Sequence, residues 1–219
     1  MSEVAALAPF CVLFLLSVFA AQGRHRGVLR ATKTATTLSL LLVVGVPRDP
    51  LQAFVAGGIV LSAAGDTVLL SDGKRAFLTA VFLFLLVNIA YTIGLLRSGA
   101  VGAPGVLTGL AVVAVLLSTG VFLRALWKGV EARLRVPVVV YGVALSVMVV
   151  VAILVGQGPW TPLLRGLLVA GALLFYVSDA VLAWSRFRRQ FPQQQTINLV
   201  LYWAGQLGIA LAARWSGWS

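Results

Sequence analysis

Two aspartates, Asp66 and Asp179, are the only acidic residues inside the long apolar segments that make up most of this chain. They occur in similar phrases, Gly-Asp-Thr-Val-Leu-Leu and Ser-Asp-Ala-Val-Leu-Ala. A carboxylate at membrane depth costs about 2.5–3.5 kcal/mol on insertion scales, so it is seldom retained without a partner or a task. A pair of carboxyls can supply an acid and an anion, and we expect the chemistry of the protein there.

Other polar side chains recur at helical spacing within the apolar segments. Asn198, Tyr202 and Gln206 form an i, i+4, i+8 stripe, and Asn88 and Tyr91 are three residues apart. Such stripes can face one cavity. The residues predicted to contact a substrate beside the two catalytic aspartates are Lys33, Ser62, Asn88, Tyr91, Tyr141, Tyr176, Ser178, Tyr202 and Gln206.

Each of these residues also has a structural interpretation. Asn88, Gln206 and the tyrosines can serve as hydrogen-bonding contacts between helices. Lys33 can be an interfacial lysine whose ammonium group extends to the membrane surface. The aspartates can be structural if they pair with Lys33 or with an arginine of a connection, although two matched acids are hard to explain by packing.

The composition is that of an integral membrane protein. Hydrophobic residues make up 60% of the 219 residues and charged residues 11%, with a mean hydropathy of +1.01. The net charge of +11 comes from Lys and Arg scattered over short connections, which argues against nucleic-acid binding. The single Cys11 and the single His25 exclude an internal disulfide and a zinc site of the usual ligands, and we expect no metal and no cofactor.

The sequence predicts one all-α transmembrane domain, 1–219, because no linker is long enough to separate a second domain. The first apolar run lacks a basic leader and is expected to remain as a membrane span. A span needs about 20 apolar residues. The eight spans predicted on this basis are 4–22, 31–46, 51–71, 76–96, 104–126, 135–155, 162–184 and 197–214.

Basic residues divide unequally between the two sides of this bundle. Of the 17 Lys and Arg, 13 fall in or beside the odd-numbered connections, from Arg24 onward, and four lie on the other side. Since cytoplasmic connections of membrane proteins are rich in Lys and Arg, the odd connections are predicted to be cytoplasmic and both termini outside, as in a multi-pass protein of a cell inner membrane.

The two halves of the chain resemble each other around the aspartates. A shift of 113 residues places Asp66 on Asp179 and Gly58 on Gly171. The shift equals four spans, so the hypothesis is two parallel four-helix repeats related by an axis along the membrane normal, with chance as the alternative. Asp66 lies five residues before Ser71, and Asp179 seven before Arg186, which predicts a shared depth about 8–11 Å from the charged connections.

At these residues the sequence resembles the YhhN-type lysoplasmalogenase family of eight-span membrane proteins. The resemblance covers nearly the whole chain. Two positions depart from the family pattern: Asn88 stands where a histidine is usual, and Thr34 follows Lys33 where a proline is usual. The phrases that carry the resemblance are Ser62-Ala-Ala-Gly-Asp66-x-x-Leu69, Gly171-Ala-Leu-Leu-Phe-Tyr-Val-Ser178-Asp179-x-x-Leu-Ala183 with Arg186-Phe187, and Tyr202-Trp-Ala-Gly-Gln206.

This resemblance implies hydrolysis of the vinyl ether bond of lysoplasmalogens to a fatty aldehyde and glycerophospho-ethanolamine or glycerophospho-choline. The reaction needs an acid that protonates the β-carbon and an anion that stabilises the resulting oxocarbenium ion, and it needs no metal. Either aspartate can be the acid. Asp66 follows Gly65 and Ala64 and is chosen as the acid, whereas Asp179, after Ser178, is expected to be better hydrogen-bonded. The partners implied are a lysophospholipid substrate and membrane lipids.

Two other classes of function remain open. Intramembrane acids near a repeat axis also occur in proton-coupled transporters of small molecules or lipids, although no pair of broken spans marks a transport site here. The Asn88 departure favours the third class, a non-catalytic lipid-binding membrane protein.

Overall fold

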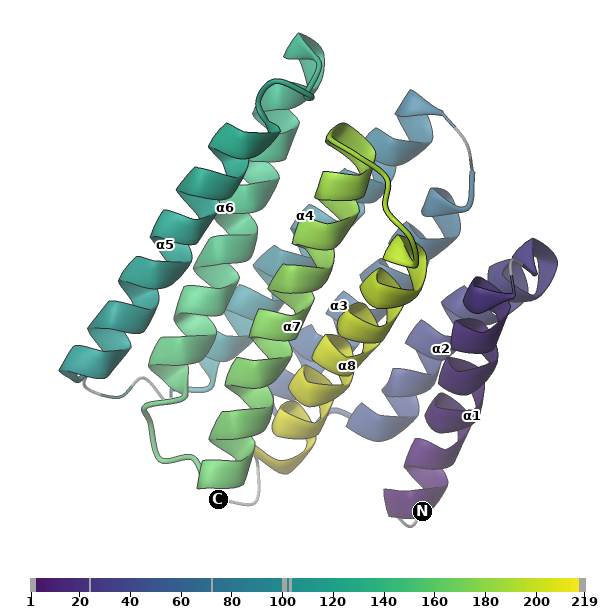
Figure 1. Ribbon diagram of the computed structural model, residues 1–219. Coiled ribbons are helices and arrows are strands. Elements are labelled where there is room, and N and C mark those ends of the chain that lie inside the picture. Colours follow the sequence, from purple (N-terminus) through teal and green to yellow (C-terminus); the bar gives the residue numbers. More distant parts are fainter. Residues whose placement is uncertain (1–2, 24, 72, 100–101, 103, 217–219) are drawn as a thin grey trace.

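The computed structural model describes residues 3–23, 25–71, 73–99, 102 and 104–216, so Arg24 lies outside the described residues. Across these ranges the chain forms helices and no strands (Figure 1), which confirms the predicted all-α bundle with eight helices long and apolar enough to span a membrane. The helices are α1 (Glu3–Gln22), α2 (Arg26–Val44), α3 (Pro50–Leu69), α4 (Lys74–Arg97), α5 (Val106–Leu126), α6 (Ala132–Val155), α7 (Pro162–Phe187) and α8 (Gln194–Trp215).

The distribution of polar side chains is that of a protein surrounded by lipid. Ser62, Asn88 and Gln206 are fully buried, whereas Phe19 is 67% and Val121 69% exposed on the outer faces of their helices. A contiguous apolar exterior of this kind is stable in lipid and not in water. The protein is therefore an integral, multi-pass membrane protein.

Helix boundaries follow local signals that a span prediction based on apolar length does not use. The second span was predicted at 31–46, but α2 begins five residues earlier and ends at Val44 because Gly45 adopts a positive φ of 73°. Helix α3 begins at Pro50, with the Asp49 carboxylate accepting a hydrogen bond from the Gln52 N–H at 2.8 Å. This start fixes the register that carries Asp66.

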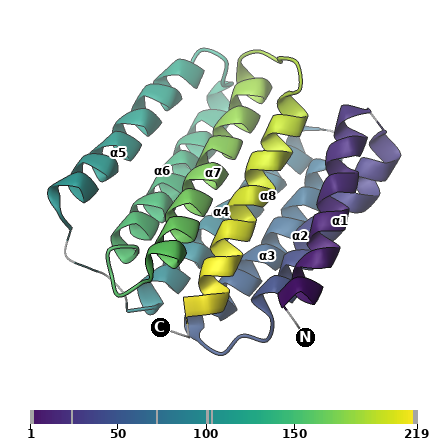
Figure 2. The same ribbon diagram turned by 60° about the horizontal axis from the view of Figure 1, so that its bottom comes forward.

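The helices alternate in direction, so the start of α1 and the end of α8 lie at the same end of the bundle (Figures 1 and 2). We call this end the terminal face. The opposite end carries the α1–α2, α3–α4, α5–α6 and α7–α8 connections, and we call it the basic face. Helices α3 and α4 form one close pair and α7 and α8 another, while α5 lies at the edge.

The pairings agree with the hypothesis of two repeats without testing it. The α3–α4 pair of the first half corresponds to the α7–α8 pair of the second, and the contact of α2 with α8 corresponds to that of α6 with α4. The repeat relation itself stays a prediction.

Glycines at the helix contacts make room for aromatic rings and close backbones. A Cβ on Gly58 of α3 would lie 2.1 Å from the Tyr91 ring of α4, and a Cβ on Gly205 of α8 would lie 2.8 Å from the Gly171 carbonyl of α7. These contacts bring α3 close to α4 and α8 close to α7.

Replacing Gly58 with Ala is expected to destabilise the protein by about 1–3 kcal/mol, because the added methyl group overpacks the contact with Tyr91. The adjacent change Gly57→Ala is the matched control, since a Cβ there meets nothing within 4 Å. Thermal unfolding of both variants in the same detergent measures the difference. Equal unfolding temperatures would contradict the packing described for Tyr91.

Candidate functional site

Asp66 lies in the last turn of α3, close to the basic face, and is 1% exposed. Its Oδ1 is 3.0 Å from the Lys33 ammonium of α2. Its Oδ2 accepts hydrogen bonds from the Thr37 hydroxyl at 2.6 Å and the Tyr202 hydroxyl at 3.0 Å. One cation and two hydroxyl donors around a buried carboxyl stabilise the ionised form of that carboxyl.

Helical spacing places Asp66 and the polar residues near it in one row along the contact between α3 and α8. Gly58, Ser62 and Asp66 are four residues apart and share a face of α3, and Tyr202 and Gln206 share a face of α8. The two helices run antiparallel, so Tyr202 reaches Asp66 while the Gln206 amide donates to the Ser62 hydroxyl at 2.9 Å. Tyr202 and Gln206 of the stripe predicted on α8 therefore face α3, whereas Asn198 of that stripe donates to the Ser178 carbonyl of α7.

Tyr91 extends this row toward the terminal face. Its hydroxyl donates to the Gln206 Oε1, and its ring lies against Gly58. Tyr91 and Gln206 are both fully buried. The two residues thus join α4 and α8 through a hydrogen bond between helices, one turn farther from the basic face than the Asp66 contacts.

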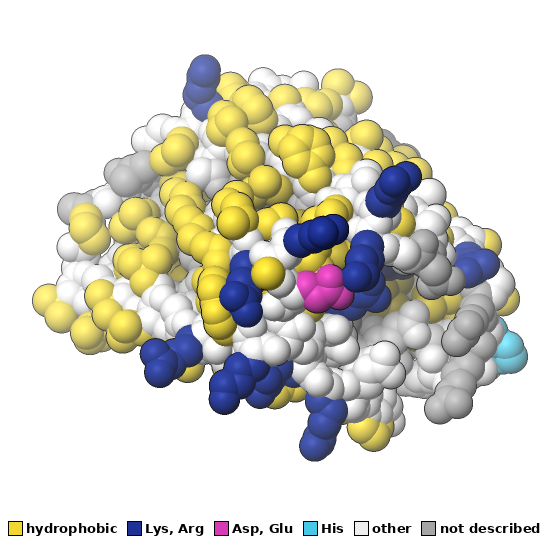
Figure 3. Space-filling view, turned by 90° about the horizontal axis from the view of Figure 1, so that it is seen from above, with side chains coloured by type: hydrophobic (Ala, Val, Ile, Leu, Met, Phe, Trp, Pro, Cys, Tyr) yellow, Lys and Arg dark blue, Asp and Glu magenta, His cyan; other side chains and the backbone are white. Residues whose placement is uncertain are grey.

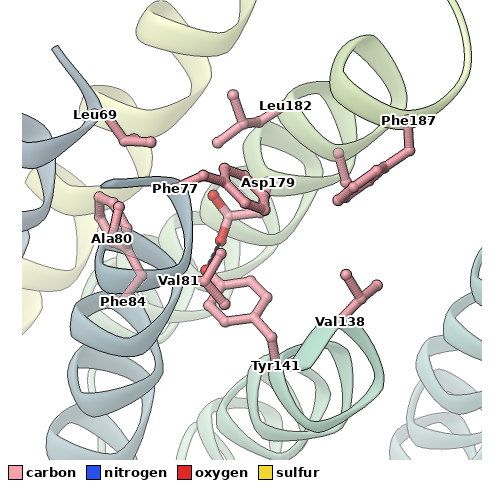
Figure 4. A pocket seen from close by; sticks show the side chains of 11 residues that line it. Leu69, Phe77, Ala80, Val81, Phe84, Val138, Tyr141, Asp179, Leu182 and Phe187 are labelled. Carbon is pink, nitrogen blue, oxygen red and sulfur yellow. Dashed lines mark hydrogen bonds between the residues drawn. The ribbon is translucent and has the colours of Figure 1, made fainter. Parts of the chain in front are cut away.

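Asp179 has different surroundings. It lies about two turns inside the end of α7, and its Oδ2 accepts a hydrogen bond from the Tyr141 hydroxyl of α6 (Figure 4). The Ser178 hydroxyl is 3.5 Å from its Oδ1. Among the described residues, the ion pairs are Lys33 with Asp66 and Lys74 with Glu131, so Asp179 has no ion-pair partner there.

Two apolar cavities of about 60 Å³ each adjoin Asp179 and Tyr141. The first lies between α3, α4, α6 and α7, and Leu69, Phe84 and Phe187 are among the side chains around it in Figure 4. The second lies between α5, α6 and α7. An unpaired carboxyl in apolar surroundings is favoured as the neutral acid, because the ionised form loses its hydration without a compensating charge.

The surroundings of the two carboxyls share an aromatic contact. The ring of Tyr202, which binds Asp66, packs edge-on against Phe84, and Phe84 lines the cavity beside Asp179. Asp66 and Asp179 thus lie in adjoining surroundings that meet at Phe84. Their contacts favour the reverse of the sequence-based assignment, with Asp66 as the anion and Asp179 as the acid.

Asn88 is fully buried on α4, near the Tyr141 that binds Asp179. Its amide nitrogen donates to the Phe84 carbonyl at 2.9 Å, and its side chain lies next to the Tyr141 hydroxyl. Its buried Oδ1 has no hydrogen-bond partner among the described residues. A buried acceptor without a partner is costly, so such an atom calls for a hydrogen-bond donor such as a water.

Two of the predicted substrate contacts lie beside this region and not within it. The Tyr176 hydroxyl bonds Thr119 of α5 at 2.8 Å, so its ring lines the second cavity. The Ser178 hydroxyl donates to the Phe175 carbonyl at 2.7 Å. Among the described residues, no three His, Cys, Asp or Glu side chains gather as a possible metal site.

Trp203 and Thr37 are members of the site that were not among the residues predicted from the sequence. The fully buried Trp203 donates its indole N–H to the Thr37 hydroxyl at 3.1 Å, and Thr37 in turn donates to Asp66. The i, i+4 spacing of Lys33 and Thr37 was the available signal. Trp203 gave none, because its role depends on the rotation of α8 against α2.

Basic side chains spread over the basic face, around an acidic group near its middle (Figure 3). Arg186, in the last turn of α7, stacks on the Phe77 ring at 4.9 Å, and Phe77 lines the cavity that reaches Asp179. A phosphate bound at this rim would therefore lie at the opening of an apolar space that leads to a carboxyl.

The fold and the site define a polytopic helical membrane protein with two intramembrane carboxyls, one buried and ion-paired and one partly buried beside apolar cavities. Residues 28–213 match the model of the YhhN family, and the chain belongs to that family. The family suggested by the sequence phrases is thereby confirmed.

Several known proteins are similar to this chain over most of its length. The lysoplasmalogenase TMEM86B of Homo sapiens is 29% identical over 212 residues, which cover 94% of this chain and 85% of that protein. The lysoplasmalogenase TMEM86B of Rattus norvegicus is 27% identical over 212 residues, covering 94% and 83%. No solved structure matches the chain significantly.

Proposed function

We propose that this protein is a membrane-embedded lysoplasmalogenase, which hydrolyses the vinyl ether bond of lysoplasmalogens to a fatty aldehyde and a glycerophospho-ethanolamine or glycerophospho-choline. The observation that carries the proposal is the contrast between the surroundings of the two intramembrane carboxyls. Lys33 and two hydroxyls surround Asp66, whereas Asp179 adjoins apolar cavities. The similarity to lysoplasmalogenases of mammals supports the same reaction.

In the proposed mechanism Asp179 is the general acid. Its carboxyl proton passes to the β-carbon of the vinyl ether, which leaves an oxocarbenium ion at the α-carbon. Water adds its oxygen to the α-carbon and gives a proton back to the Asp179 carboxylate. The hemiacetal then breaks its bond to the glycerol oxygen, and the proton from the hemiacetal hydroxyl ends on that oxygen, so that aldehyde and glycerophospho compound leave.

Asp66 remains ionised throughout and stabilises the oxocarbenium ion by its charge. Its contacts with Lys33, Thr37 and Tyr202 hold the carboxylate in one orientation. The unpaired Oδ1 of Asn88 is assigned to the attacking water, because it is a free acceptor near the Tyr141 hydroxyl and can accept a hydrogen bond from that water. In this role the Asn88 amide only accepts a hydrogen bond from the water, so it neither gains nor loses a proton.

The basic face is proposed to be cytoplasmic and both termini external, on the 13 to 4 distribution of Lys and Arg. The substrate then enters from the cytoplasmic leaflet. Its phosphate binds near Arg186 and its hydrocarbon chain lies in the apolar cavities around Asp179. This placement brings the vinyl ether bond, next to the glycerol, to the depth of the carboxyls.

Purified protein in detergent tests the proposal with a defined lysoplasmalogen as substrate. Aldehyde release, measured with a coupled dehydrogenase, is the expected result, and the matching lysophospholipid with an ester bond tests the selectivity for vinyl ethers. No aldehyde from the vinyl ether would overturn the proposal. Uptake of the lipid into sealed vesicles without product would assign the protein to the transporters instead.

A further inference from the structure

A second, larger cavity lies at the terminal face, at the other end of the bundle from the carboxyls. Its volume is about 260 Å³, and it shares no lining residue with the two cavities beside Asp179. Figure 2 shows this end, where the α2–α3 connection passes near the ends of α1 and α8. The cavity is lined by Ala6, Leu7, Leu42, Val43, Gly45, Val46, Arg48, Leu211, Arg214 and Trp215.

Arg214 is fixed in this cavity by the end of α2. Its Nη1 donates to the Val44 carbonyl at 3.2 Å, which uses one of the five N–H donors of a guanidinium group. A Cβ at position 45 would lie 2.4 Å from this Nη1, so glycine leaves the space that the guanidinium occupies. The end of α2 and Gly45 therefore fix the position of the Arg214 guanidinium.

The buried Gln52 connects the backbone of Arg48 to the backbone of Arg214. The Gln52 Oε1 accepts the backbone N–H of Arg48 at 2.9 Å, and the Gln52 Nε2 donates to the Arg214 carbonyl at 3.4 Å. Gln52 is 4% exposed. The backbones that carry both arginines are thus joined by one amide side chain, which holds the two residues at one cavity.

The charge of the two arginines is not neutralised by an ion pair with any described residue. The neighbouring Asp49 carboxylate caps α3 through the Gln52 N–H, and with two arginines it leaves the site positive. Arg48 and Arg214 are two of only four basic residues assigned to this side of the bundle. Their common cavity is therefore a local concentration of positive charge on a face that is otherwise poor in it.

We propose that this cavity binds the phosphate head group of an anionic phospholipid from the membrane leaflet at the terminal face. A guanidinium group can donate two parallel hydrogen bonds to the oxygens of one phosphate. The Leu7, Leu42 and Leu211 side chains provide an apolar wall for the adjoining acyl carbons. A tryptophan such as Trp215 suits the level of the head groups. The proposal does not depend on the hydrolase function.

Native mass spectrometry of the purified protein in detergent, titrated with phosphatidylglycerol, tests this site. The double variant Arg48→Gln/Arg214→Gln is expected to bind phosphatidylglycerol at least tenfold more weakly than the unchanged protein. Arg97→Gln is the matched control, because Arg97 is an exposed arginine at the same face, and its affinity is expected to be unchanged. Phosphatidylcholine is expected to bind more weakly than phosphatidylglycerol.

Inorganic phosphate added as a competitor distinguishes a lipid head group from a free anion. Displacement of the lipid by an equal concentration of phosphate would overturn the lipid assignment. Arg48→Gln alone keeps the backbone bond to Gln52 and is expected to fold even where Arg214→Gln does not. Unchanged affinity for phosphatidylglycerol in Arg48→Gln, or equal losses in Arg97→Gln, would overturn the site.

Discussion

Replacing Asp179 with Asn is expected to lower the rate of aldehyde release by about 10²–10⁴-fold, the usual contribution of a positioned acid. The amide oxygen can still accept the hydrogen bond from the Tyr141 hydroxyl, so the α6–α7 contact persists. The variant should therefore fold and bind substrate as before, because the change removes a transferable proton and little volume. Steady-state kinetics with a lysoplasmalogen measure the effect, which is expected in kcat more than in KM.

Glu131→Gln is the matched carboxyl-to-amide control for this variant. Glu131 pairs with Lys74 at the surface of the basic face, and both side chains are more than half exposed. Its replacement is expected to leave aldehyde release unchanged. Full activity in Asp179→Asn would remove the proposed acid, and equal losses in both variants would point to a general effect of charge at the basic face.

The main features of the fold follow from the sequence because they depend on the length of apolar runs. Eight runs long enough to cross the bilayer predict eight helices, and the separating turns carry Gly, Pro and charged residues. Helix ends were less predictable. The start of α2 at Arg26 adds a first turn that is bounded by Arg26 and Arg30 and was left out of the predicted apolar run, although such a turn extends readily into the head-group region.

The members of the site were predictable, but their roles were not. Helical spacing identified the row of Tyr202 and Gln206, which meets α3 in the structure. Which aspartate carries a counter-ion depends on the rotation of α2 and α6 about their axes. That rotation brings Lys33 to Asp66 and Tyr141 to Asp179, and no residue spacing within one helix encodes it.

The contact between Lys33 and Asp66 revises the interpretation of both residues. A lysine that only extends to the membrane surface would be exposed, whereas the Lys33 side chain is 13% exposed and lies 3.0 Å from the carboxylate. This structural pairing and the catalytic role of Asp66 are compatible, because the cation keeps the carboxylate ionised and oriented. The two roles can be separated by their effects on stability and on rate.

Replacing Lys33 with Met is expected to destabilise the protein by about 3–5 kcal/mol, because it leaves the buried Asp66 carboxylate without a counter-ion. Adding Asp66→Asn removes the unpaired charge, so the double variant should recover most of the lost stability. It should not recover aldehyde release, because the anion that stabilises the oxocarbenium ion is then absent. Thermal unfolding in detergent and the aldehyde assay, applied to the same preparations, measure the two effects.

Lys74→Met provides the control for the loss of a lysine charge, since it breaks the exposed pair with Glu131 and is expected to change stability by about 0–1 kcal/mol. A Lys33→Met protein as stable as the unchanged one would show that Asp66 needs no counter-ion, and the assignment of Asp66 as the anion would fail. A double variant that is stable and fully active would exclude Asp66 from the reaction. The combination of restored stability with absent activity separates the structural use of this ion pair from its chemical use.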